Sequence, residues 1–191
     1  PSSGYVVVAG VWCVVGGRAQ SATVMEASAA AEVYKDINTE AEGRLGLADA
    51  LTYANRLGAT HIINAATLTG AVSVALGSVR VALLGNHKAL GDGIAMRGRH
   101  CGERFWPLPM DPDYLEPMRG DMSDLRNAGA DRKAGTITAA KFLEQFVEGT
   151  PWAHLDIAGT AWFDKAQPNA GKGASGIAVR TLVRLAEGWG S

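Results

Sequence analysis

The chain has 191 residues, of which 47% are apolar and 19% are charged, and its formal net charge is −1. This length suits one domain with a substantial hydrophobic core. The composition and the balanced charge give no indication of a disordered chain or of a basic nucleic-acid-binding stripe. Two cysteines, Cys13 and Cys101, are too few for a disulfide framework and indicate a reducing compartment.

Strand-like and helix-like segments alternate along the chain, which is typical of an α/β fold with a mostly parallel or mixed central sheet flanked by helices. The apolar run Val6–Val15 is too short to cross a bilayer, which takes about 20 residues, so we expect a strand buried on both faces. The first predicted elements are a strand over Tyr5–Val15, a helix over Ala22–Glu32, an extended piece over Val33–Ile37 and a helix over Gly43–Leu57 closed by Gly58. There follow a strand over His61–Ala66, a short helix opening at Thr67–Gly70 and ending near Gly77, a strand over Val79–Leu84 and a helix over His87–Glu103. The last are an irregular connection over Trp106–Asp131, a helix over Thr136–Val147, a strand over Trp152–Ile157 and a helix over Ala174–Glu187.

Charged side chains occupy alternate positions in the segment Asn38–Leu45, at Glu40, Glu42 and Arg44. In an extended segment alternate side chains share one face, and next-but-one Cα atoms lie roughly 6.5–7 Å apart. Two carboxylates at this spacing can bind one divalent cation or bridge two, with the arginine beside them for an anion. The alternative is an exposed strand end with a surface ion pair worth about 0–1 kcal/mol.

Several blocks of sequence together resemble the leucine aminopeptidase family, the cytosolic two-metal aminopeptidases. They occur in the family's order and spacing and cover most of the chain from Asn38 to the last helix. The blocks are Asn38–Leu45 with Leu47–Leu51, Ala65–Ala71, Ala134–Ala140, Pro151–Gly159 and Lys172–Gly176.

The resemblance implies a metal-dependent aminopeptidase that releases N-terminal residues from peptides, with leucine-like residues preferred. In the family two divalent ions, zinc or manganese and in some cases magnesium, activate a water that attacks the scissile carbonyl. The resemblance also implies a homohexamer in the cytoplasm. By position, Glu40 and Glu42 are metal ligands, and Arg44 holds a bicarbonate that serves as the general base. The implied substrate contacts are Asn38, Thr67, Leu68, Gly70 and Ala158, the last being small enough to leave room for a leucine-sized side chain.

This chain departs from the family pattern in three places. The family has aspartate where this chain has Glu40, and the added methylene moves the carboxylate by about 1.5 Å. The family also uses an upstream lysine and two aspartates as metal ligands, and a further lysine as an electrophile, in a glycine-rich segment that is absent here. Within Trp12–Ala31 only Gly16–Gln20 follows the family pattern. We therefore expect residues 1–191 to be a single catalytic-domain portion without the N-terminal domain and the upstream metal-ligand segment.

Two other functions stay open. A non-catalytic paralogue or assembly subunit of the same fold would account for Glu40 and for the absent ligands. DNA binding, which some bacterial relatives possess, is disfavoured by the near-neutral charge, and we expect no membrane association.

Some polar residues have a structural interpretation beside a functional one. His154 and Asp156 share one face of a predicted strand, and we favour a buried hydrogen-bonded pair over a metal or acid–base role. The role of Asn64, near the end of another strand, stays open. His100–Cys101 has no second pair at zinc-ligand spacing, and Gly171–Gly173 indicates a tight loop rather than an anion site.

Overall fold

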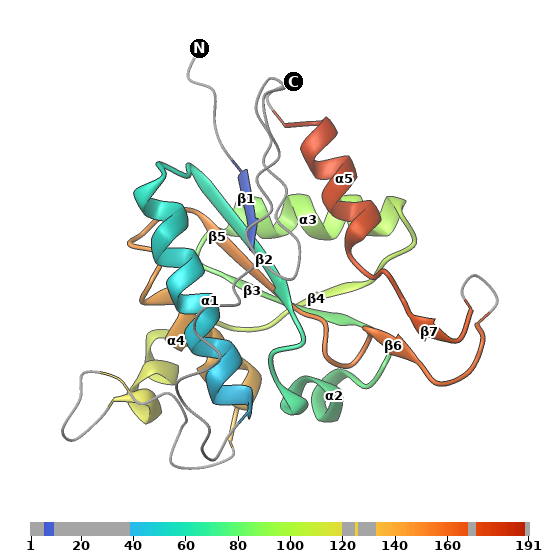
Figure 1. The fold of residues 1–191 in the computed structure, drawn as a ribbon, viewed down its shortest axis with the longest axis horizontal. Helices are drawn as coiled ribbons and strands as arrows, with labels where there is room; N and C mark the ends of the chain where they lie inside the picture. The colour runs from blue at the N-terminus through green and yellow to red at the C-terminus, as the bar shows by residue number, and fades with distance from the viewer. Residues whose placement is uncertain (1–5, 10–38, 120–124, 126–132, 168–170, 190–191) are drawn as a thin grey trace.

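The computed structural model is an α/β fold in three layers, with a five-stranded sheet between two layers of helices (Figure 1). It describes residues 6–9, 39–119, 125, 133–167 and 171–189, with residues 6–9 and 39–42 described by their backbone. The helix predicted over Ala22–Glu32 and the extended piece predicted over Val33–Ile37 lie outside these ranges. No helix among the described residues is long and apolar enough to cross a membrane.

The central sheet is mixed, with the strand order β1-β2-β5-β3-β4. Its strands are β1 (Val6–Ala9), β2 (His61–Ala66), β3 (Val81–Gly85), β4 (Phe105–Pro107) and β5 (Trp152–Asp156). β1, β2 and β5 run parallel, whereas β3 lies antiparallel to β5 and parallel to β4. Because β2 and β5 point the same way, their carboxyl ends meet at one edge of the sheet, where α/β proteins commonly bind ligands.

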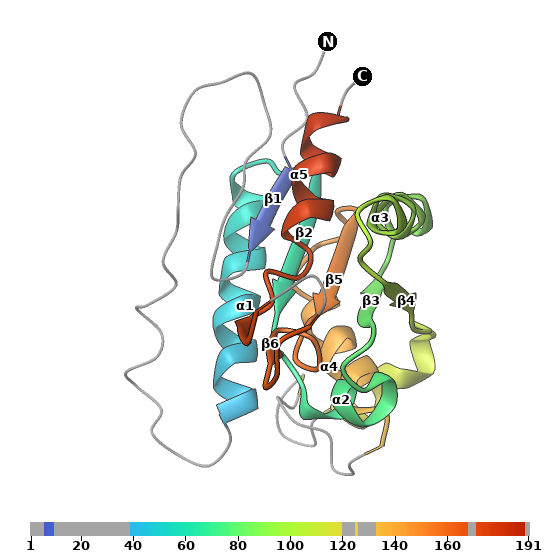
Figure 2. The same cartoon turned by 90° about the vertical axis from the view of Figure 1, so that its right-hand side faces the viewer.

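Two helix layers cover the sheet from opposite sides. The helices are α1 (Thr39–Arg56), α2 (Gly70–Leu76), α3 (Lys88–His100), α4 (Gly135–Glu144) and α5 (Val179–Glu187). Figure 2 shows α1 and α3 on opposite sides of the sheet. Side chains alternate across each strand, so Ile62 and Trp152 pack beneath α1 and α4, while Ile63 and Leu155 pack beneath α3 and α5.

Helix α1 begins at Thr39, four residues before the predicted start at Gly43. The segment that carries Glu40, Glu42 and Arg44 is therefore helical rather than extended. Positions two apart on a helix do not face each other, so the shared face expected from an extended segment was wrong. The predicted end is confirmed, because Gly58 has a φ of +78° and its N–H donates to the carbonyl of Asn55.

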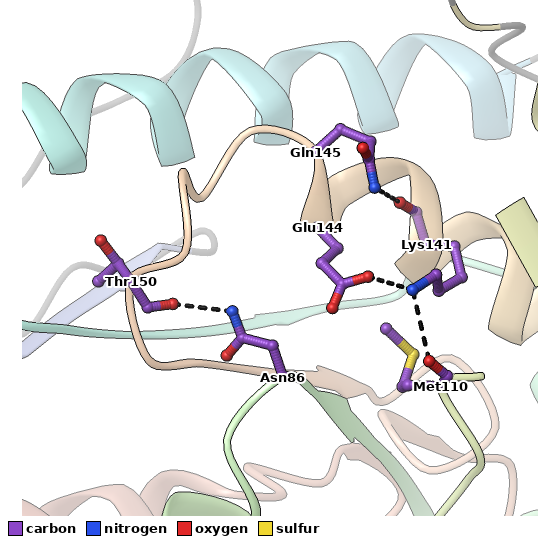
Figure 3. Close-up of polar contacts among 6 residues, drawn as sticks. All are labelled: Asn86, Met110, Lys141, Glu144, Gln145 and Thr150. Carbon is purple, nitrogen blue, oxygen red and sulfur yellow. Dashed lines mark hydrogen bonds and ion pairs between the residues drawn. The ribbon is translucent and has the colours of Figure 1, made fainter. Parts of the chain in front are cut away.

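The middle of the chain agrees closely with the predicted pattern. Strand β2 has the predicted bounds, and α2 begins after Thr69, whose side chain accepts a hydrogen bond from the Val72 N–H. The predicted irregular connection overlaps the end of β4 and contains a 3-10 helix, η1 (Pro112–Met118), which packs against α4. The amino end of β5 is held by Asn86, whose side chain donates to the Thr150 carbonyl over 3.0 Å (Figure 3).

The last helix starts five residues later than predicted. Gly173–Ala174 forms the short strand β7, which pairs with β6 (Trp162–Phe163) in a separate two-stranded sheet. Gly176 and Ala178 then have φ values of +63° and +70°, which a right-handed helix cannot contain. Helix α5 therefore begins only at Val179, with the buried Glu103 carboxylate accepting hydrogen bonds from the N–H and hydroxyl of Thr181.

Candidate active site

The segments that carry the predicted substrate contacts meet at the carboxyl edge of the sheet. Residues 67–69 follow β2, residues 157–159 follow β5, and the two strands are paired in register up to Ala66 and Asp156. The beginnings of α1 and α2 lie at this same end of the molecule (Figure 1). Neighbouring parallel strands thus bring together residues that are about 90 positions apart in the sequence.

Asp156 is the buried residue that joins these two loops. Its Oδ1 accepts hydrogen bonds from the backbone N–H groups of Leu68 and Ala158, each over 3.2 Å. Its Oδ2 accepts a hydrogen bond from the hydroxyl of Thr69 over 2.7 Å. Burial raises the pKa of Asp156 above its ordinary value, and the hydrogen bonds from Thr69, Ala158 and Leu68 act in the opposite direction.

Thr69 carries the connection on to α4. Its hydroxyl lies 3.0 Å from the hydroxyl of Thr136, in the first turn of α4, and accepts a hydrogen bond from the Val72 N–H. A hydroxyl has one proton, and that of Thr69 goes to Asp156 when this residue is ionised, so Thr136 is the donor in their contact. The loop after β2, the start of α2 and the start of α4 are therefore held by one polar network.

A second buried network crosses from β5 to β2 on the sheet face that α1 and α4 cover. The indole Nε1–H of Trp152 donates to Asn64 Oδ1 over 2.7 Å, and Asn64 Nδ2 lies 2.8 Å from His154 Nδ1. Since the indole can only donate, it orients the amide, and Asn64 becomes the donor to His154. His154 Nε2 is buried and has no hydrogen-bond partner among the described residues.

Arg44 lies close to this second network. It is buried on α1, and its guanidinium carbon lies 5.9 Å from the centre of the Phe142 ring on α4. Burial lowers the pKa of His154 to about 3, and the positive charge of Arg44 acts in the same direction. His154 is therefore neutral at physiological pH, and the charge in this part of the core belongs to Arg44.

The described side chains do not form a metal centre by themselves. Among them there is no group of three or more histidine, cysteine, aspartate or glutamate residues that could hold a metal ion. Glu40 and Glu42 lie in the first turn of α1 and belong to the residues described by their backbone. Cys101 forms no disulfide and is half-buried, and neither it nor His100 belongs to a group of three or more such side chains among the described residues.

Comparison with known proteins decides the family. A family model described as the catalytic domain of the cytosol aminopeptidase family matches residues 6–183, which is most of the chain. The chain belongs to this family.

Curated relatives and a solved structure agree with this assignment. A probable cytosol aminopeptidase of Solibacter usitatus is 51% identical over 91% of this chain and 36% of its own length. One from Koribacter versatilis is 46% identical over 97% of this chain and 37% of its own length. The structure of a mutant of tomato leucine aminopeptidase matches with a TM-score of 0.72 and 42% identity, covering 78% of this chain and 29% of that one. The chain thus spans about a third of the length of these cytosol aminopeptidase relatives.

The fold places some of the residues predicted from the family resemblance close together. Leu68 is buried and Ala158 half-buried, and both bind the Asp156 carboxylate, with the exposed Thr67 and Gly70 on either side of the loop after β2. Asn38 lies outside the described residues.

The predicted hydrogen-bonded pair of His154 and Asp156 was half right. Both are buried, but they belong to different networks and are not hydrogen-bonded to each other in the described contacts. Sequence reasoning left the role of Asn64 open and missed Thr69 and Thr136. The signal for these three was their position beside the ends of elements, where short polar side chains commonly hydrogen-bond.

Proposed function

We propose that this chain carries part of the active site of a metal-dependent aminopeptidase that releases leucine-like N-terminal residues from peptides. One observation supports this most directly. Within a cytosol aminopeptidase catalytic domain, a single buried carboxylate, that of Asp156, holds together the two loops that bear Leu68 and Ala158. A hydrophobic pocket beside fixed backbone groups is what recognition of an apolar side chain requires.

In this proposal Glu40 and Glu42 are ligands of two divalent ions, either zinc or manganese, with magnesium as a third candidate. Such ions lower the pKa of a bound water and polarise the scissile carbonyl. The family resemblance implies that the remaining ligands are an upstream lysine and two aspartates, so metal binding is tested on full-length protein. The described side chains alone do not fit a two-metal centre.

Residues of this chain would prepare the site in two ways. Arg44, as a buried guanidinium beside the sheet, would hold a bicarbonate that acts as the general base. Leu68 and Ala158 would bound the space for the substrate's first side chain, with Asn38, Thr67 and Gly70 contacting the rest of the substrate. The active form would be a homohexamer in the cytoplasm.

The direct test uses full-length protein freed of metal and then titrated with zinc or manganese. We expect two ions bound per subunit, and hydrolysis of a leucyl anilide that EDTA abolishes. Glu42→Gln should lose metal binding, whereas Asp49→Asn, at an exposed position on α1, should keep it and serves as the matched control. Absence of metal binding at saturating zinc and manganese would contradict the proposal.

A second candidate function is based on Glu40, because the family has aspartate at that position. A non-catalytic paralogue or assembly subunit would bind metal weakly and leave the leucyl anilide intact. Glu40→Asp in the full-length protein distinguishes the two. Activity that appears only in this variant would identify a lineage whose ligand set has decayed, and activity already present in the natural protein would exclude the alternative.

A further inference from the structure

The two loops at the carboxyl edge of the sheet are joined through one oxygen atom. Asp156 Oδ1 accepts from the Leu68 N–H and from the Ala158 N–H, each over 3.2 Å. The two nitrogens therefore lie at most about 6.4 Å apart, twice the single distance, as long as both hydrogen bonds persist. The Asp156 side chain therefore limits how far the backbones at Leu68 and Ala158 can separate.

The carboxylate itself is prevented from rotating. Its other oxygen, Oδ2, accepts the short hydrogen bond from the Thr69 hydroxyl, and Thr69 is in turn fixed by the Val72 N–H and by Thr136. Asp156 is fully buried and Thr69 almost fully buried, so water does not compete for these contacts. An oxygen held in this way can set the position of two backbone segments.

The loop after β5 has little freedom to move towards α2. A Cβ added at Gly159 would come within 2.2 Å of the Gly77 carbonyl oxygen, so this turn already packs directly on the end of α2. The Ile157 N–H also donates to the Ala66 carbonyl, continuing the β2–β5 pairing beyond the strands. Asp156 thus acts between two segments that are otherwise anchored to the same sheet.

We propose that Asp156 is a positioning residue that sets the width of the pocket for the substrate's N-terminal side chain, and so its preference among apolar residues. This rests on the proposed aminopeptidase function, in which Leu68 and Ala158 bound that pocket. Asp156 would not touch the reacting atoms. It would act through the backbone of the two residues that do contact the side chain.

The experiment compares kcat/KM for leucyl and alanyl anilides in full-length protein. Asp156→Ala removes the acceptor of the Leu68 and Ala158 N–H groups and of the Thr69 hydroxyl, and we expect the leucyl-to-alanyl ratio to fall at least about tenfold, within the range of discrimination that a hydrophobic pocket provides. Asp156→Asn keeps Oδ1 for the two N–H groups. Its amide can donate to Thr69, whose proton then turns to Thr136, so this variant should keep the ratio within about threefold of the natural protein. Asp164→Ala, the same change at an exposed position beyond β6, is the matched control and should leave the ratio unchanged.

A merely structural role would lower kcat/KM for both substrates by the same factor and leave their ratio as it was, which would overturn the proposal. If Asp156→Ala does not fold, Thr69→Val offers a second test, because it removes the hydroxyl that donates to Oδ2 and so holds the carboxylate less firmly. We then expect the leucyl-to-alanyl ratio of kcat/KM to fall at least about threefold, and an unchanged ratio would contradict the positioning role.

Amide hydrogen exchange separates this proposal from the proposed function. The Leu68 and Ala158 amides should exchange faster in Asp156→Ala and keep their natural rate in Asp156→Asn, whether or not the protein hydrolyses peptides. Inactivity of the natural protein towards both anilides would contradict the aminopeptidase function. Equal protection of the two amides in all variants would contradict the positioning role.

Discussion

Asn64 and His154 face each other across β2 and β5, with Asn64 Nδ2 lying 2.8 Å from His154 Nδ1 in the fully buried layer beneath α1 and α4. Because Trp152 donates to the other end of the same amide, the direction of this hydrogen bond is determined: Asn64 donates and His154 accepts. The neutral imidazole therefore carries its proton on Nε2. The Trp152 indole thus sets the tautomer of His154 through Asn64, without a hydrogen bond between Trp152 and His154.

The pH dependence of stability follows from the lowered pKa of His154. In the unfolded chain a histidine titrates near 6.5, whereas burial lowers the pKa of His154 in the folded protein to about 3. Between these values the unfolded state binds the proton and the folded state does not. The contribution of neutral His154 to the free energy of unfolding is therefore complete above pH 6.5. It is lost as the pH falls towards 3, at up to about 1.4 kcal/mol per pH unit.

Urea unfolding at a series of pH values checks this expectation. His154→Asn keeps an acceptor for Asn64 but removes the titrating ring. Between pH 6 and about 3 the free energy of unfolding should then fall less steeply with pH, with a slope that is smaller by about one proton. His61→Asn is the control, because His61 also has a lowered pKa, from partial burial and the nearby charge of His87, yet lies in a different part of the protein. The His61 variant should keep the fall between pH 5 and 3, and an equal effect of both changes would contradict the assignment to His154.

Removing the donor of Trp152 should disturb the whole buried network. Trp152→Phe keeps an aromatic ring but leaves the Asn64 carbonyl oxygen without its donor, at an expected cost of about 1–3 kcal/mol plus the lost ring volume. Nitrogen NMR of the His154 side chain should also show a shift of the proton between Nδ1 and Nε2, because the amide is free to turn. Trp162→Phe, at a position that is 60% exposed, should change the stability by less than about 0.5 kcal/mol.

The ion pair of Lys141 and Glu144 on α4 is another buried polar contact with a measurable role. Lys141 pairs with Glu144 and also donates to the Met110 carbonyl over 3.4 Å, so it fixes the segment before η1 to the helix (Figure 3). Lys141→Met leaves the Glu144 carboxylate largely buried without its partner, and we expect a loss of about 3–5 kcal/mol in the free energy of unfolding.

A double variant and an exposed pair provide the comparison. Adding Glu144→Leu to Lys141→Met should recover much of the loss, since the uncompensated charge is then gone. Lys88 and Asp92 form a pair at the same kind of helical spacing, with side chains that are 87% and 63% exposed, against 8% and 19% for Lys141 and Glu144. Lys88→Met should therefore cost less than about 1 kcal/mol. Similar losses for both lysines would show that burial does not control the effect.

Gly159 should tolerate no side chain, because of its direct contact with the Gly77 carbonyl. Gly159→Ala would place a methyl group 2.2 Å from that oxygen, and either the turn after β5 or the end of α2 must move. We expect a destabilisation of about 1–3 kcal/mol. If the protein is the aminopeptidase that we propose, the KM for a leucyl anilide should also change, since Ala158 is the adjacent residue. Gly171→Ala, where an added Cβ meets nothing within 4 Å, should leave both stability and KM unaltered. A KM that is unchanged in Gly159→Ala would contradict the proposed place of this turn beside the substrate pocket.

Local pattern alone accounted for much of the fold. Leu47, Leu51 and Ala54 recur at helical spacing and lie on the buried side of α1, and Gly58 predicted its end, because these features depend on helical periodicity and on the φ angles that glycine permits. The start of α1 was missed. Its first turn carries charged residues without an apolar stripe, so nothing in the pattern distinguished helix from extended chain. The late start of α5 was missed for a related reason, since the left-handed conformation of Ala178 has no sequence signal.

The sequence by itself determined the α/β class and, through the order and spacing of its blocks, the family to which the chain belongs, because both are properties of linear pattern. It also marked Leu68, Ala158, His154 and Asp156 as residues of interest. Only the tertiary structure decided how they are connected. The parallel pairing of β2 with β5 brings residues some 90 positions apart within hydrogen-bonding distance. It thereby separates His154, held by Asn64, from Asp156, which holds the loops after both strands. Hydrogen bonds across a sheet depend on register and burial, and neither is determined until the strands have paired.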